Sequence, residues 1–208
     1  RQYRRRACKS VLAVALRQGL IRRVTPSAAG SPPPPLDGQF PAVLTFADRQ
    51  HALKNDMTEL HVQEWLNTDQ PMSLDSFRGR VLAVEVFQML CPGCVSHGLP
   101  QAGRLASTFP ADKLAVVGLH SVFEHHAAMT TVALRAFLHE YRIRFPVAVD
   151  QPGSTGPMPR TMAEWQLEGT PTLVLFDRAG QMRARHFGQV SDLALGAQIM
   201  GLLLEGEA

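Results

Sequence analysis

Residues 81–87 (VLAVEVF) form the most informative run of the sequence, because six of the seven are apolar and several are β-branched. A strand that is covered on one face alternates apolar and polar residues, whereas a strand that is covered on both faces is apolar almost throughout. The run therefore predicts a central strand in a sheet with helices on both sides.

Other runs predict the elements around this strand, with apolar residues at spacing two for strands and at helical spacing for helices. In chain order we expect a leading strand at 60–66, a helical turn at 73–77, the strand 81–87, a helix at about 94–109, a strand at 114–119, a helix at 131–141, a strand at 145–149, a short helix near 161–165, a hairpin of 172–176 with 181–187, and a helix at 192–204. Strand-helix-strand units pair in parallel and hairpins antiparallel. This order predicts an α/β sandwich with a mixed sheet.

The first 35 residues differ in composition from the rest. They contain eight of the 21 basic residues and no acid, and they end in a Pro-rich stretch that predicts a stiff linker. Residues 36–208 then hold 13 basic and 18 acidic residues, so the net charge of +3 comes from this segment, and we expect no nucleic-acid binding. We predict a disordered basic arm with linker at 1–35 and one folded domain at 36–208.

The apolar run 11–16 bears on location. It is too short for a membrane-spanning helix, which needs roughly 18 apolar residues, and Arg17 follows it directly. The same run is a poor secretory signal, because Arg22 and Arg23 stand where a small-residue cleavage site would be needed. We expect no stable membrane insertion and a cytoplasmic location, with a periplasmic or organellar location after removal of the basic leader as the alternative.

Cysteine chemistry is predicted at Cys91-Pro92-Gly93-Cys94, directly after the strand 81–87. A thiolate at a helix N-terminus faces unsatisfied N–H groups, and Pro suits the first helical turn. We expect Cys91 to attack a disulfide and Cys94, on the same turn, to resolve the mixed disulfide. Two inert cysteines and two ligands of a zinc site are the alternatives. Cys8, the third cysteine, has no assigned role.

Glu85 is the one charged residue within the apolar strand, so burial should raise the pKa of its carboxyl. It either makes a structural hydrogen bond or accepts the proton of Cys94. Met89 and Leu90 precede the nucleophile and either form an apolar rim for protein substrates or serve packing alone.

Four histidines are further candidates. His97 lies one helical turn after Cys94 and either tunes a thiolate, completes a Cys-Cys-His ligand set, or lies on the helix surface. His120 ends the strand 114–119 at the sheet edge that carries the cysteines, close in sequence to His125 and His126. This group either binds a metal or consists of solvated and capping side chains.

The CPGC motif after the strand, the Thr170-Pro171 dipeptide before the strand 172–176, and the closing hairpin and helix resemble the thioredoxin superfamily. More narrowly, residues 73–204 resemble the bacterial redoxins, a group of thiol-disulfide reductases and peroxiredoxin relatives. The resemblance implies a thioredoxin-like three-layer sandwich with a leading N-terminal hairpin and an insertion after the first strand-helix unit.

The resemblance also assigns residues. It implies that Pro171 is cis and lies against the cysteine pair, that the backbone of Thr170 pairs with an extended substrate, and that Glu85 is the buried acid of the family. Two positions depart from the family pattern and concern redox tuning: Leu90 replaces an aromatic residue, and Pro92-Gly93 replaces Gly-Pro.

These residues predict a thiol-disulfide oxidoreductase whose only redox group is the Cys91–Cys94 disulfide, without metal or other cofactor. Its expected partners are a protein thiol or disulfide substrate and a redox partner protein. A peroxiredoxin-like peroxidase is one alternative, but Gln88 stands where that family carries a hydroxyl. A copper-binding chaperone on the same fold would need a histidine at the place of Gly169-Thr170-Pro171.

Overall fold

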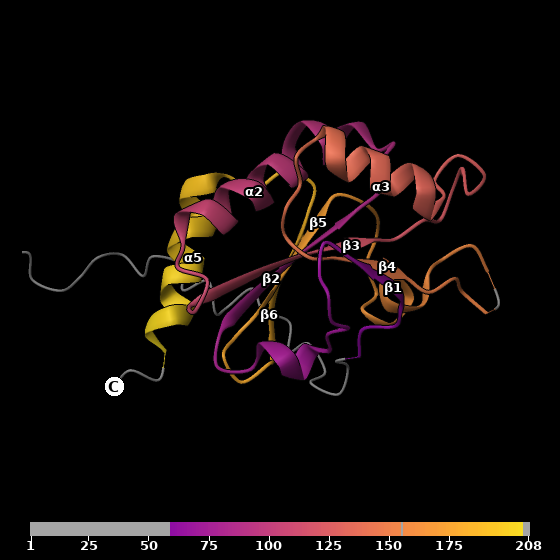
Figure 1. The fold of residues 1–208 in the computed structure, drawn as a ribbon. Helices are drawn as coiled ribbons and strands as arrows, with labels where there is room; N and C mark the ends of the chain where they lie inside the picture. Colours follow the sequence, from indigo (N-terminus) through magenta and orange to yellow (C-terminus); the bar gives the residue numbers. More distant parts are fainter. Residues whose placement is uncertain (1–58, 155, 206–208) are drawn as a thin grey trace, which may run out of the picture. The chain divides into compact units, whose positions relative to one another are not determined.

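A six-stranded mixed sheet forms the centre of the computed structural model, which describes residues 59–154 and 156–205, all within one folding unit (Figure 1). The strand order is β1-β4-β3-β2-β5-β6. Strands β2, β3 and β4 are parallel, while β1, β5 and β6 each run antiparallel to a neighbour. The strands are β1 (Val62–Leu66), β2 (Val81–Phe87), β3 (Leu114–His120), β4 (Val147–Asp150), β5 (Thr172–Phe176) and β6 (Met182–Phe187).

Helices cover both faces of this sheet and make the three layers (Figure 1). On one face, α2 (Leu99–Thr108) and α5 (Asp192–Leu204) pack against Val81 and Ala83 of β2, and α3 (Thr131–Glu140) packs against β4. On the other face lie α4 (Arg160–Glu164) and the 3-10 turn Leu74–Phe77. The predicted fold class, including the fully buried central strand, is confirmed.

The helix predicted at 94–109 is α-helical only in its second part. Residues Cys94–Gly98 form a π-helical turn, in which the N–H of Leu99 donates to the carbonyl of Cys94. The cause is Pro100, which has no N–H to donate four residues back and whose ring crowds the preceding turn. The helix admits the proline by adding one residue to that turn, and α2 then continues from Leu99.

Strand β4 also differs from the prediction, and part of the predicted N-terminal organisation lies outside the described residues. Strand β4 begins at Val147, two residues later than expected, because Pro146 cannot donate to a ladder. Of the predicted leading hairpin, the described residues contain β1, whose partner among them is β4. The boundary predicted between residues 35 and 36 lies outside the described residues. Within 59–154 and 156–205, no helix has the length and apolarity that a membrane crossing requires.

Candidate active site

The two cysteines follow β2 at the edge of the sheet where parallel strands end. The N–H of Cys91 donates to the carbonyl of Gln88 at 3.1 Å, which turns the chain into the helix. Cys91 is half-buried, whereas Cys94 is fully buried. The backbone N–H of Cys94 donates to Sγ of Cys91 at 3.3 Å. An N–H aimed at sulfur stabilises a thiolate, so this arrangement suits Cys91 to attack.

The Thr170-Pro171 segment lies against the cysteines. The peptide bond between these residues is cis, which is the conformation that the resemblance implies. Sγ of Cys91 lies 3.6 Å from the carbonyl oxygen of Thr170. A Cβ placed on Gly93 would lie 3.2 Å from Cδ of Pro171, so the proline ring packs directly beneath the motif. The structure thus brings the Thr170-Pro171 segment against the cysteine motif, which lies about 80 positions earlier in the chain.

The buried Cys94 thiol has a perturbed pKa. Burial raises the pKa of the Cys94 thiol well above its ordinary value, and the neighbouring Cys91 sulfur raises it further. A buried thiol of this kind stays protonated at neutral pH. Cys94 therefore needs a proton acceptor before it can act as a nucleophile.

Glu85 is a buried carboxyl on β2, 1% exposed, whose Oε1 has no hydrogen-bond partner in the described part of the chain. Desolvation raises its pKa from 4.5 to about 8. A group with this pKa exchanges a proton near neutral pH. The unpartnered oxygen argues against a purely structural hydrogen bond at that atom.

Gly98 brings the helix onto Glu85, a role that the sequence analysis did not assign. A Cβ at this position would lie 3.0 Å from Cβ of Pro171 and closer still to Oε1 of Glu85. Only a glycine lets the π-helical turn pass directly over the carboxyl and the cis-proline. The available clue was a glycine inside a predicted helix, four residues after Cys94.

Gln88 is a second residue that the sequence analysis missed, having been used only to argue against a peroxidase. Its side chain is 1% exposed. Its Oε1 accepts the N–H of Phe123 at 3.2 Å, and its Nε2 donates to Glu124 at 3.4 Å. The amide therefore ties the loop after β3 to the segment that leads into Cys91.

His120 lies at the predicted sheet edge, where it is buried rather than solvated. It is 2% exposed, and burial lowers its pKa to about 4, so the imidazole is neutral. Its Nε2 accepts the N–H of Met89 at 3.4 Å. His125 and His126 are exposed. Among the described residues, no three or more His, Cys, Asp or Glu side chains are grouped to hold a metal ion.

His97 does not form the ligand set that its spacing allowed. It is half-buried, and its Nε2 has no hydrogen-bond partner among the described residues.

The predicted apolar rim is reduced to one residue. Leu90 is 54% exposed beside Cys91, but Met89 is 5% exposed and packs in the core with Leu134 of α3. The prediction of a substrate-contacting Met89 is corrected on this point. Side chains two apart after β2 keep pointing to the same face, so Met89 follows Phe87 into the core.

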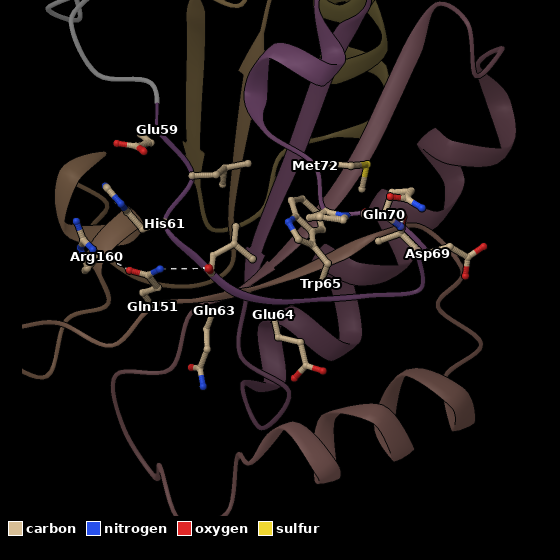
Figure 2. A pocket seen from close by; sticks show the side chains of 14 residues that line it. Glu59, His61, Gln63, Glu64, Trp65, Asp69, Gln70, Met72, Gln151 and Arg160 are labelled. Atoms are coloured by element: carbon tan, nitrogen blue, oxygen red, sulfur yellow. Dashed lines mark hydrogen bonds between the residues drawn. The ribbon is translucent and has the colours of Figure 1, made fainter.

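A polar hollow of about 650 Å³ lies elsewhere, at β1 (Figure 2). Figure 2 shows Gln151 in its wall, where Nε2 donates to the carbonyl of Val62 at 3.2 Å. Arg160 donates in turn to Oε1 of Gln151 at 2.7 Å. None of the predicted site residues lines this hollow.

Solved structures resemble this chain closely. The thioredoxin-like superfamily protein SPOA0173 is 58% identical, with a TM-score of 0.71 over 74% of this chain and 98% of that one. A thiol-disulfide isomerase from Corynebacterium glutamicum is 49% identical, with a TM-score of 0.70 over 73% of this chain and 98% of that one. These neighbours support thiol-disulfide oxidoreduction as the general chemistry.

Curated relatives match a smaller region. NHL repeat-containing protein 2 of Bos taurus is 30% identical over 122 residues, which make up 57% of this chain and 16% of that protein. The chain therefore spans about a sixth of that relative's length. No protein-family model matches the chain. On the identity and coverage of the solved structures, the chain belongs to the thioredoxin superfamily as a redoxin-type protein.

Proposed function

We propose that this protein exchanges disulfides with a protein substrate through Cys91 and Cys94. The observation that carries the proposal is the pairing of a half-buried Cys91 sulfur, which accepts the Cys94 N–H, with a fully buried Cys94 thiol. The similarity to a protein described as a thiol-disulfide isomerase supports it.

In the reducing direction, the Cys91 thiolate attacks one sulfur of the substrate disulfide and displaces the other as a thiolate. The Cys94 thiol then loses its proton and attacks Sγ of Cys91, which releases the second substrate thiolate. The substrate gains two electrons and two protons, while the protein is left with a Cys91–Cys94 disulfide. A redox partner protein reduces this disulfide again, and no other cofactor is required.

Glu85 takes up the Cys94 proton in this proposal. Its carboxyl lies beneath the helix at Gly98, one turn beyond Cys94, and its pKa of about 8 suits proton exchange near neutral pH. The transfer of a proton to a buried carboxylate also removes an unpaired charge from the core.

We place the activity in the cytoplasm.

Substrate binding is assigned to Thr170, Pro171 and Leu90. The Thr170 carbonyl lies 3.6 Å from the reacting sulfur, which is close enough for an extended substrate to pair with this backbone. Leu90, which precedes Cys91 in the chain, is exposed and offers an apolar contact. A peroxidase is disfavoured, because the Gln88 amide is engaged by Phe123 and offers no hydroxyl.

The test is a trapping experiment in a Cys8→Ser background, which removes the third thiol. Cys94→Ser should retain a substrate as a mixed disulfide on Cys91, because attack is preserved and resolution is lost. Cys91→Ser should retain far less, and only the parent chain should reduce insulin catalytically. Equal trapping by both variants, or equal insulin reduction by Cys91→Ser, would overturn the assignment.

A further inference from the structure

An apolar groove of about 510 Å³ runs along α2, from Val95, the residue after Cys94 in the chain, to Ser107. One wall is a stripe of small or apolar helix residues at spacings of three and four, namely Val95, Leu99, Gly103 and Ala106. Residues 141–145, which connect α3 to β4, form the other wall. The groove therefore lies between the active-site helix and the segment 141–145.

The floor of this groove is open at Gly103. A Cβ added there would meet no atom within 4 Å, in contrast to Gly98, where it would collide with Glu85. A helical glycine costs about 1 kcal/mol relative to alanine, so its presence here is not explained by helix stability. The small residue keeps the groove deep.

The groove has a basic rim. Arg142 and Arg144 are exposed in its wall, and neither guanidinium has a hydrogen-bond or ion-pair partner among the described residues. No aspartate or glutamate lines the groove. Tyr141, 57% exposed, stacks on Phe137 with ring centroids 4.4 Å apart and presents an aromatic edge beside the arginines.

We propose that this groove binds an extended segment of the protein substrate that alternates apolar and acidic residues. Apolar side chains bury against α2, and carboxylates pair with Arg142 and Arg144. From Val95 to Ser107 the helix rises about 18 Å, which five or six extended residues span. The inference rests on the proposed function, since it is disulfide exchange at Cys91 that makes the occupant a substrate.

The binding test uses a fluorescein-labelled, cysteine-free hexapeptide of sequence Glu-Leu-Asp-Val-Glu-Leu and fluorescence anisotropy. A matched peptide with lysine at every acidic position is the charge control. The acidic peptide should bind, more weakly as salt is added, and the lysine peptide should not. A protein with both active-site cysteines replaced by serine should bind equally well, because the groove does not use the sulfurs.

Two variants locate the peptide. Gly103→Leu should weaken binding at least about tenfold, equivalent to 1.4 kcal/mol, because the side chain fills the groove, while the melting temperature should not fall. Reversing both rim charges with Arg142→Glu and Arg144→Glu should weaken it by a similar factor. The matched controls are Gly196→Leu on α5, where a Cβ also meets no atom within 4 Å, and Arg160→Glu on α4. Neither control should change binding.

The outcomes separate this inference from the proposed function. Insulin reduction without peptide binding would overturn the groove assignment and leave disulfide exchange standing. Peptide binding without insulin reduction would overturn disulfide exchange and leave the groove as a peptide-binding site. Equal weakening by Gly196→Leu and Gly103→Leu, or preferred binding of the lysine peptide, would overturn the inference. So would dimerisation of the parent chain that Gly103→Leu abolishes in sedimentation velocity, because the occupant would then be a second copy.

Discussion

Two buried carboxyls lie on strands of the same sheet, and their surroundings differ. Asp150, at the end of β4, is 5% exposed and accepts three hydrogen bonds, from the N–H groups of Thr161 and Met162 and from the hydroxyl of Ser121. Glu85, in the middle of β2, is 1% exposed and has an Oε1 without a partner.

The difference separates a structural acid from a chemical one. Burial raises the pKa of both carboxyls, but the three donors around Asp150 oppose the rise by stabilising its anion. Asp150 thereby anchors the start of α4. Glu85 has no such compensation at Oε1, so its proton is exchangeable near neutral pH, and the comparison predicts that the two residues respond oppositely to substitution.

The largest effect is expected for Asp150→Ala. It leaves two N–H groups and one hydroxyl unpaired in the core, which should lower the free energy of unfolding by roughly 3 kcal/mol or more. Urea denaturation measures the loss. Asp150→Asn, which retains one acceptor oxygen, should lose less. A loss below about 1 kcal/mol in Asp150→Ala would show that these bonds do not anchor α4.

The next largest effect is expected on catalysis, in Glu85→Gln. The amide keeps the shape but accepts no proton, so resolution of the mixed disulfide should slow by about 100-fold. Stopped-flow measurement of substrate release gives this rate. Alkylation of Cys91 should be nearly unchanged. Above about pH 8, where the carboxyl is charged, the melting temperature should hold or rise, because a neutral amide costs less to bury than a carboxylate. Unchanged turnover from about pH 6 to 9 would remove Glu85 from the mechanism.

The third effect is gradual and concerns the pH dependence of stability, which changes little from one pH unit to the next. The pKa of Glu85 is 4.5 in its ordinary state and about 8 when folded, so the folded chain binds more protons between these values. Its contribution to stability is complete below about pH 4.5 and is lost as pH rises toward 8, with a slope of at most about 1.4 kcal/mol per pH unit.

The unfolding free energies of the parent chain and Glu85→Gln, measured between about pH 6 and 8, test this sign. The parent chain should lose stability relative to the variant as pH rises. A constant difference between the two would mean that the folded carboxyl does not titrate in this window.

Much of the fold was predictable because its elements carry local patterns. The run 81–87 is apolar at six of its seven positions, and β2 has these bounds. The last helix, predicted at 192–204, matches α5. The helix after the cysteines was predicted only in part, because Pro100 acts through its missing N–H and its ring, and apolar spacing does not report either.

The candidate site was predictable where the chemistry is local. The residues that carry the proposed chemistry lie within ten positions of each other, namely Glu85, Cys91 and Cys94. Met89 was misassigned, because a methionine beside a nucleophile has the same sequence pattern whether it faces solvent or the core. Asp150 was missed, since nothing nearby in the sequence shows that Ser121 and Thr161 converge on it.

The sequence by itself determined the α/β order, the dithiol motif and the presence of one acid in a buried strand, because each depends on residues close together in the chain. Only the tertiary structure decided which groups meet: Gly98 over Glu85, Thr170 beside Cys91, and residues 141–145 opposite α2. The physical reason is that burial and unpaired hydrogen-bonding groups, which set the pKa of Glu85, are properties of packing between distant segments. Local composition fixes which residues are available, and packing fixes their charge state and neighbours.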